Sequence, residues 1–385
     1  NRAGSFAEFR AAAALLAAPV QNLIYADTAG NIGYQLPGAI PRRGRGDGRT
    51  PAPGWDPSYD WRGTVPAAAL PYDYNPPSGV IIAANQPVTG PSYPYRLGSA
   101  FSYGWRSQQI ANRLTDAGPL TVEAAEQILY DDTVLFAAEL VPTLLRVKVS
   151  DAWVLEGQRT LVGWDYRADA DAAAAAYFHV VVHNLLKLTF RDEMPESLWP
   201  TAGDRWYAVL TTLLQKPRDP WWDDKSTPDR VETREDILLA ALTGARKELT
   251  SLQARDTDEW SWGAMHRVSL RHATLGSSGV GVLERIFNRG DYPVDGGPAA
   301  VNAMAYDASA RYRVTSGPVM RMVVDLADLD GSRWVNQSGV SGHAYSPHYA
   351  DQTELWATNR TWPFVSRRPA VEAATVSRLD LVPGG

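Results

Sequence analysis

The sequence has 385 residues, of which 45% are hydrophobic and 21% charged, and its formal net charge is −6. This composition is typical of a soluble globular protein that is long enough for two or three lobes. A mildly acidic chain without long Lys/Arg runs is a poor candidate for binding nucleic acid or an anionic membrane. The absence of cysteine excludes disulfides, thiol nucleophiles and thiolate metal sites. No apolar run reaches the ~18 residues of a membrane span.

The first elements in chain order are a helix and a hairpin. Residues 6–18 are rich in Ala and Leu, and they predict a helix that Pro19 ends. Segments 22–27 and 31–35 read as two strands, and the short turn with a glycine between them predicts a β-hairpin.

A long loop and a short strand are predicted next. Residues 37–79 are crowded with proline and glycine, which favours a long ordered loop. The apolar run 80–84 then predicts a strand. Pro87 cannot continue a central strand, so we expect Asn85 to lie at the strand end, where binding groups are commonly displayed.

The middle of the sequence predicts helices and the last part predicts strands. Thr121 has the position of a helix cap, and helical patterns cover residues 168–189 and 233–253, the last with a predicted capping box. Residues 190–230 read as Pro/Trp-rich connectors, and strands return with residues 319–326. The pattern predicts an α+β fold. Its three predicted domains are residues 1–115, 116–265 and 266–385.

Residues that could carry chemistry form no complete catalytic set in the sequence. His179 and His183 share one helix face, as zinc-binding histidines do, but partly buried histidines are the favoured interpretation. The acidic pairs Asp131-Asp132 and Asp223-Asp224 are adjacent residues that point in different directions, so neither predicts an acid/base dyad. No nucleophile-elbow spacing, phosphate loop or dinucleotide fingerprint is present.

Several segments resemble the penicillin acylase family, and together they cover nearly the whole chain. The order and spacing of these segments is the strongest part of the likeness. The segments are Tyr25-Ala-Asp-Thr-Ala-Gly-Asn-Ile-Gly-Tyr34, Tyr74-Asn-Pro-Pro-Ser-Gly79 with Ala83-Ala-Asn-Gln-Pro87, Tyr103-Gly-Trp-Arg-Ser-Gln-Gln-Ile110, Trp262-Gly-Ala-Met-His-Arg267 and Ser341-Gly-His-Ala-Tyr-Ser-Pro-His-Tyr349.

The resemblance implies an N-terminal-nucleophile hydrolase with a layered αββα fold and a helical insertion lobe. Family members cleave themselves into two subunits, and the new N-terminal Ser of the large subunit attacks a linear amide. Asn85 matches the family's oxyanion-binding asparagine and Arg106 its site arginine, while Gln21 matches a position that lines the acyl pocket. The likeness begins inside the large subunit, so the nucleophile is expected outside this chain. One antiparallel sheet system is expected to hold residues 22–35, 80–85 and 319–326.

The resemblance also carries expectations about partners, metal and location. The expected partners are the upstream segment of the large subunit, the small subunit and an acylated small-molecule amide. Family members often bind a structural calcium, but Tyr93-Pro-Tyr-Arg-Leu97 holds no carboxylate where one is expected, so no metal ligand and no cofactor is assigned. An extracytoplasmic location is expected by resemblance only.

A second hypothesis remains open on the sequence alone. Fourteen Trp and seventeen Tyr suit aromatic cores and an acyl pocket alike. They would also suit a non-catalytic, aromatic-rich binding or scaffold protein on the same fold. A partner chain that begins with Ser would separate the two hypotheses.

Overall fold

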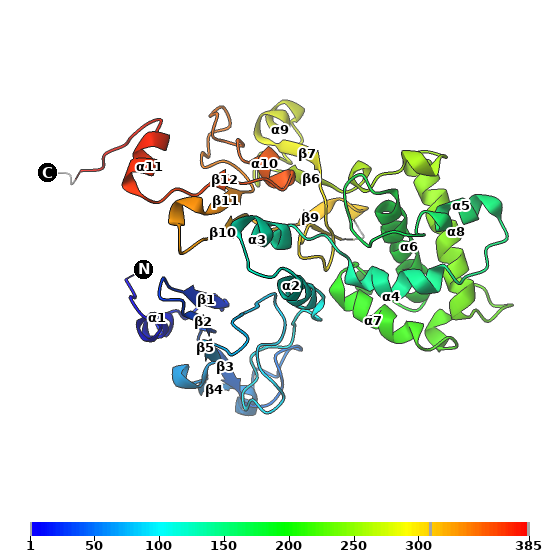
Figure 1. Ribbon diagram of the computed structural model, residues 1–385. Coiled ribbons are helices and arrows are strands. Elements are labelled where there is room, and N and C mark those ends of the chain that lie inside the picture. The colour runs from blue at the N-terminus through cyan, green and yellow to red at the C-terminus, as the bar shows by residue number, and fades with distance from the viewer. Residues whose placement is uncertain (1, 308–309, 383–385) are drawn as a thin grey trace. The chain divides into compact units, whose positions relative to one another are not determined.

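The chain folds into two compact units, Asn1–Ser107 and Gln108–Gly385, in a computed structural model that describes residues 2–307 and 310–382 (Figure 1). Each unit has its own strands and its own buried apolar cluster. The division into domains at 115/116 and 265/266 stays a prediction. None of the helices in the described ranges combines the length and apolarity that crossing a bilayer requires.

Unit 1 is built on a small sheet covered by one helix. The sheet has the strand order β1-β2-β5, and β3 pairs with β4 separately. The elements are α1 (Phe6–Ala13), β1 (Leu23–Ala26), β2 (Ile32–Gln35), β3 (Pro41–Arg43), β4 (Trp61–Thr64) and β5 (Tyr72–Tyr74).

The predicted hairpin is confirmed, and Asp27 explains its turn. Strands β1 and β2 pair antiparallel, with Tyr25 opposite Gly33. The Asp27 carboxylate accepts hydrogen bonds from the backbone amides of Ala29 and Asn31 and from the Asn31 side chain. These hydrogen bonds, first the one from the Asn31 side chain, lower the pKa of Asp27 to about 2. The carboxylate therefore stays charged and holds the turn closed across the neutral range.

Helix α1 is fixed to the sheet through a glycine. A Cβ at Gly33 would come within 2.3 Å of the Phe6 ring, so only glycine lets the helix approach this closely. Phe6 also stacks on Tyr74, with ring centroids 4.6 Å apart. The helix begins at the Ser5 cap and ends at Ala13, five residues before the predicted end at 18.

Two predictions for the region after the hairpin are wrong. The proline-rich stretch 37–79 contains three strands, because β3 and β4 pair locally and β5 adds to β2. Residues 80–84 form no strand. The Gln86 side chain accepts from the Ala84 N–H and donates to the Ile82 carbonyl, both at 2.7 Å. These bonds satisfy backbone groups that a strand would have paired with a neighbour.

Unit 2 begins with helices, which fill the predicted helical range 116–265. Helix α7 lies inside the stretch 190–230 that was interpreted as connector only. The helices are α2 (Trp105–Asp116, which starts in the last residues of unit 1), α3 (Val122–Leu129), α4 (Leu135–Leu144), α5 (Ala152–Arg159), α6 (Ala173–Phe190), α7 (Asp204–Leu214) and α8 (Arg234–Leu252).

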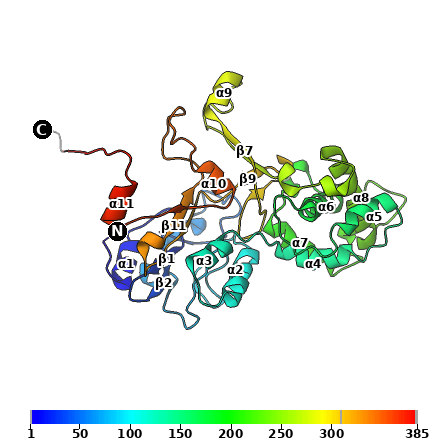
Figure 2. The same cartoon turned by 45° about the horizontal axis from the view of Figure 1, so that its top comes forward.

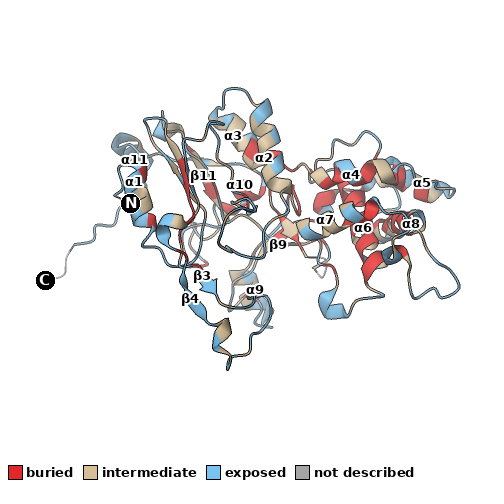
Figure 3. Cartoon of the chain, turned by 90° about the horizontal axis from the view of Figure 1, so that it is seen from below, coloured by how far each residue is buried: buried red, intermediate tan, exposed pale blue. Residues whose placement is uncertain are grey.

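The core of the helical lobe lies around α6. Its Ala and Val residues are buried, and the neighbouring helices α4 and α8 turn their buried faces towards it (Figure 3). Beside it, the fully buried guanidinium of Arg246 lies between the rings of Trp153 and Trp260, 4.8 Å from each centroid. Arg246 also donates to the backbone carbonyls of Trp153 and Arg255 and pairs with the Glu156 carboxylate at 3.1 Å, so the buried cation is compensated by rings, carbonyls and one carboxylate.

The remainder of unit 2 is mostly short strands. Strands β6 and β7 form a ribbon with α9 at its far end (Figure 2). Strands β10, β11 and β12 form a second sheet in that order. The elements are β6 (Arg267–Leu270), α9 (Gly281–Phe287), β7 (Arg289–Pro293), β8 (Ala305–Tyr306), β9 (Val314–Ser316), β10 (Met320–Val323), β11 (Arg333–Asn336), α10 (Thr353–Ala357), β12 (Trp362–Pro363) and α11 (Arg368–Ala374).

The expectation of one sheet system for residues 22–35, 80–85 and 319–326 is wrong. Strand β10 pairs with β11, whereas the hairpin of residues 22–35 pairs with β5, and the two sheets belong to different units. The backbone groups of each sheet are paired with strands of the same unit, so no ladder joins the two segments.

The predicted capping box of α8 is confirmed and gives a first test. Thr233 accepts from the Asp236 N–H, and the Asp236 carboxylate accepts from the Thr233 N–H. We expect Thr233→Ala to lower the free energy of unfolding by about 1 kcal/mol, measured by urea unfolding of the chain. Thr243→Ala, inside the same helix, is the control and should cost less, because alanine suits a helix interior. Equal losses for both variants would contradict a role for the cap.

Candidate active site

Asn85 lies in a tight turn of unit 1 rather than at the end of a strand. Its φ angle is +67°, in the left-handed region that asparagine tolerates better than most residues. The preceding Ala84 is buried and the Asn85 side chain is exposed. The Asn85 carbonyl accepts from the Ser102 N–H at 2.8 Å, which ties the turn to the segment before α2. The turn therefore presents the Asn85 amide outward from a fixed backbone.

Arg106 lies beside Asn85, as the resemblance implies. From the first turn of α2, its Nη2 donates to the Asn85 Oδ1 at 2.6 Å and to the Ala84 carbonyl at 3.1 Å. A guanidinium has donors only, so the oxygen of the Asn85 amide must face it. The Nδ2 group of Asn85 consequently points away from Arg106 and can donate to a bound group. Arg106 thus fixes which end of the amide is presented.

Gln21 lies two residues before β1 with an exposed side chain. Its assignment to the acyl pocket stays a prediction.

A hollow adjoins the Asn85 turn within unit 1. It measures about 460 Å³, a volume in the range of small-molecule sites. Its lining mixes aromatic and aliphatic side chains with the Gln86 amide, the Asp73 carboxylate and the Thr89 hydroxyl. The lining includes Tyr34, Tyr72, Ile81, Ile82, Gln86 and Val88. Residues on both sides of Asn85 in the sequence, Ile82 and Gln86 among them, line this hollow, and Ile81, Ile82 and Val88 give it apolar surface.

The segment after Asn85 is where the family resemblance implies a calcium ligand. Arg96 is present there, and its guanidinium lies 3.3 Å from the Asp47 carboxylate. Arg49 also binds Asp47, at 2.6 Å. Two guanidinium groups on one carboxylate repel a divalent cation, so these residues do not fit a calcium site.

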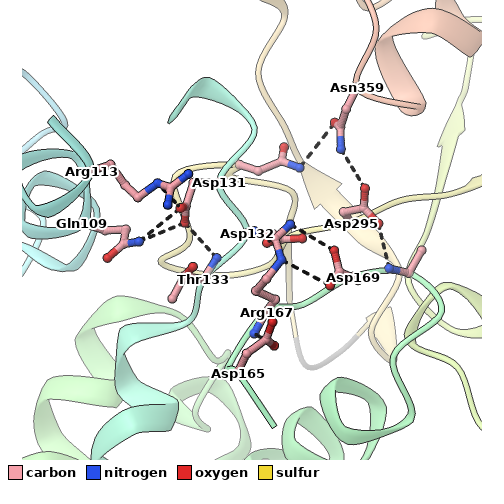
Figure 4. A network of polar contacts seen from close by, with 12 residues as sticks. Gln109, Arg113, Asp131, Asp132, Thr133, Asp165, Arg167, Asp169, Asp295 and Asn359 are labelled. Atoms are coloured by element: carbon pink, nitrogen blue, oxygen red, sulfur yellow. Dashed lines mark hydrogen bonds and ion pairs between the residues drawn. The ribbon is translucent and has the colours of Figure 1, made fainter. Parts of the chain in front are cut away.

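The acidic pair Asp131-Asp132 is the centre of a buried network in unit 2 (Figure 4). Asp131 accepts from Gln109 on α2 and pairs with Arg113 at 3.1 Å. Its backbone carbonyl accepts from the Asn302 N–H. The sequence analysis did not predict that Asp131 organises a buried network. The feature that could have indicated it is a pair of adjacent aspartates in a mostly apolar region.

The second carboxylate of the pair lies among other acids. Oxygen atoms of Asp132, Asp169 and Asp295 lie within 4.8 Å of one another. Arg167 bonds to Asp169 and lies 3.0 Å from Asp132. Asp295 accepts from the Ala170 N–H and from the Asn359 side chain, both at 2.7 Å. Three carboxylates could hold a cation, but the Arg167 guanidinium already lies among them.

The carboxyl groups of this cluster differ in pKa. Burial and a hydrogen bond to Asp169 raise the pKa of Asp132 to about 8. Burial opposes the charge of Asp169 too, but hydrogen bonds from Arg167 and Asp132 hold its pKa below the usual value. Asp132 is therefore the protonated partner near neutrality and Asp169 the charged one.

The histidines of α6 are part of the core, which agrees with the favoured sequence interpretation. His179 is fully buried and stacks on Trp262, whose other side stacks on His266. Burial, with a smaller effect of His266, lowers the pKa of His179 to about 3. His183 is only partly buried. Among the described residues, the acidic triad is the cluster with metal-ligand spacing, and neither histidine belongs to it.

Comparisons with known proteins define the family. The family model for penicillin amidase matches residues 1–373. The acyl-homoserine lactone acylase QuiP of Pseudomonas syringae pv. syringae (strain B728a) is 29% identical, over 94% of this chain and 46% of that protein. The penicillin acylase 2 proenzyme of Pseudomonas sp. (strain SE83) is 30% identical, over the same shares. The chain thus spans about half the length of these relatives.

A solved structure supports the same assignment at the level of the fold. The thermostable penicillin G acylase from Alcaligenes faecalis matches with a TM-score of 0.68 and 20% identity, over 100% of this chain and 71% of that one. With 36% helix and 12% strand, the chain is a mixed α and β protein, as predicted, and it shares the fold of that penicillin G acylase. It belongs to the penicillin amidase family.

The carboxyl cluster gives a pH test. The pKa of Asp132 is raised on folding, so its contribution to stability is present below about pH 4 and is lost as the pH rises towards 8. Burial also raises the pKa of Asp295, which acts in the same direction. We expect Asp132→Asn to weaken this loss, so that its stability relative to wild type increases from pH 5 to pH 8 in urea unfolding.

The control for this test is Asp165→Asn, which changes an exposed carboxylate two residues before Arg167. It should leave the pH dependence as in wild type. An Asp132→Asn difference that is constant or shrinks between pH 5 and pH 8 would contradict a raised pKa.

Proposed function

We propose that this chain is part of the large subunit of a self-processing acylase that hydrolyses linear amides. The observation that carries the proposal is the Arg106–Asn85 pair, in which a left-handed turn and a guanidinium orient one side-chain amide. Family membership supports the reaction class. In this proposal the Ser nucleophile lies outside these 385 residues, which is compatible with relatives about twice as long.

Asn85 and Arg106 have separate roles in the proposed mechanism. When a nucleophile adds to an amide carbonyl, the oxygen becomes negatively charged, and a preorganised donor stabilises it more than it stabilises the substrate. Asn85 Nδ2–H supplies such a donor without transferring a proton. Arg106 acts by holding Asn85 Oδ1, so that the amide does not have to reorient during the reaction.

The relatives and the hollow next to Asn85 support a proposal for the substrate class. An acylated amine such as a penicillin-type amide, an acyl-homoserine lactone or a lipopeptide amide is the proposed substrate. The acyl chain would lie against the apolar side of the hollow, where Ile81 and Tyr72 contribute carbon surface. Gln21 is proposed as a further contact to the acyl chain.

The proposed partners are the upstream part of the large subunit and the small subunit. Strand β10 exposes Met320 and Met322 on one side, at 47% and 42%, and the flanking Val319 is 70% exposed. An apolar edge of this kind is usually covered in the assembled protein. An extracytoplasmic location is part of the same proposal.

The first kinetic test is Asn85→Ala in the complete, correctly processed enzyme. Losing one oxyanion donor typically lowers kcat by 10²–10³, or roughly 2.7–4 kcal/mol, and we expect a loss in that range with KM nearly unchanged. Asn112→Ala removes an exposed asparagine of α2 and is the matched control. Near-normal kcat for Asn85→Ala would make Asn85 a turn residue only.

The second kinetic test is Arg106→Lys. An ammonium cannot reproduce two directed bonds from one planar fork to Asn85 Oδ1 and the Ala84 carbonyl. We expect kcat to fall about tenfold or more, because the Asn85 amide is then free to turn. Arg218→Lys, an exposed site, controls for the change of cation. An unchanged kcat would show that Arg106 does not contribute to the reaction.

The isolated chain gives a third test. If the nucleophile lies elsewhere, the 385-residue chain should neither turn over a chromogenic acyl-amide nor be labelled by a sulfonyl fluoride. The complete protein should do both. Labelling of a serine within this chain would overturn the proposed division of the site, and a complete protein without amidase activity would favour the scaffold hypothesis.

A further inference from the structure

A basic hollow lies in the helical lobe of unit 2, among residues that the proposed acylase reaction does not use. It measures about 470 Å³. His183 and Lys187 on α6 and Arg191 at its C-cap follow one another at intervals of four, so they share one helix face. Arg311 faces the hollow from the loop before β9, and Glu248 and Leu252 from α8. Side chains from three separate segments therefore converge on one volume.

The charges in this hollow are not balanced. Lys187, Arg191 and Arg311 bring three cations against the single carboxylate of Glu248. Within residues 2–307 and 310–382, neither Lys187 nor Arg311 forms an ion pair with a carboxylate. The guanidinium of Arg191 lies 4.4 Å from the Trp199 ring centroid, a contact that orients it without neutralising it. Two positive charges remain in excess.

Glu248 belongs to the wall of the hollow rather than acting as the counter-ion. Its Oε1 accepts from the Tyr312 hydroxyl at 2.8 Å and its Oε2 from the Asn184 amide at 2.9 Å. Asn184 can approach α8 because Gly244 has no side chain. A Cβ at this position would come within 2.7 Å of the Asn184 Oδ1. Neutral donors thus hold the carboxylate in place, which leaves the cations available to another anion.

The loop that brings Arg311 is held in an uncommon conformation. Arg311 and Tyr312 have φ angles of +49° and +71°, two successive non-glycine residues in the left-handed region. Tyr312 is 1% exposed, so burial of its ring stabilises this backbone. Conformations of this kind cost about 1–3 kcal/mol each and persist where the surroundings determine them, often at ligand sites.

We infer that this hollow binds a small organic dianion, such as a phosphate monoester, through Lys187, Arg191 and Arg311. A dianion matches the two uncompensated charges, and guanidinium forks suit phosphate oxygens. The volume exceeds that of a phosphate group, and Leu252 with Tyr312 offers carbon surface for an organic remainder. This site is independent of the proposed amide hydrolysis.

The histidines provide a readout that needs no enzymatic activity. The chain has six histidines, and His183 lines the hollow. Titrating the full chain with phenyl phosphate or inorganic phosphate should move the His183 ring signal in the NMR spectrum. Sodium chloride at matched ionic strength is the control and should not move it. The signal is assigned with His183→Gln. We expect saturable shifts with both phosphates, tighter for phenyl phosphate, with a Kd of about 1 mM or below.

Charge removal then tests the residues. Lys187→Gln and Arg311→Gln should each weaken phenyl phosphate binding about tenfold or more, as expected for the loss of a charge-assisted contact. Lys247→Gln removes an exposed cation from α8 outside the hollow and should leave Kd unchanged. Because all three residues are exposed, their folding is checked by the unchanged signal of buried His179. Shifts equal to those with chloride, or equal losses in all three variants, would overturn the site.

Discussion

Two adjacent buried carboxylates, Asp131 and Asp132, hold unit 2 together. The first binds side chains from α2, and its carbonyl binds the loop before β8. The second lies with Asp169 and Asp295 around Arg167, which brings the segment before α6 to the segment after β7. Buried charge is tolerated only when it is paired or neutralised. The cluster meets this requirement with one guanidinium and one retained proton, so the helical lobe and the β ribbon share a fixed junction.

Polar side chains also shape the candidate active site in unit 1, where one of them substitutes for regular backbone pairing. Gln86 satisfies the backbone around residues 82–84, which frees Asn85 to adopt a left-handed turn. Arg106 then fixes the orientation of the Asn85 amide. A strand at this point would have committed the backbone to a ladder. The irregular segment costs regular hydrogen bonds, but it presents a donor on a rigid base, which is what stabilising a developing oxyanion requires.

The two units serve different chemistry in this interpretation. Unit 1 carries the amide-orienting pair near a hollow of mixed apolar and polar lining, in agreement with membership of the penicillin amidase family. The helical lobe of unit 2 carries a separate hollow with excess positive charge, lined from α6, α8 and the loop at Arg311. The first would act on an uncharged amide and the second on an anion. The two proposed ligands therefore differ in charge.

The sequence by itself determined the local elements whose causes lie within a few residues. The hairpin depends on Asp27 and its turn, and α8 on the capping box of Thr233 and Asp236. The family motifs also indicated which residues to examine, and they placed Asn85 and Arg106 near one another. The content of Ala, Val and Leu in residues 168–189 was enough to predict a helix there, and α6 covers most of this range.

Only the tertiary structure decided features that join distant residues. It divided the expected single sheet between two units, because each strand pairs with partners of its own unit. It replaced the strand at 80–84 by a turn, since Gln86 competes for its backbone groups. It also brought Asp132 together with Asp169 and Asp295, and Arg311 with the basic face of α6. A sequence pattern reports local periodicity, whereas these contacts depend on which distant surfaces the chain buries together.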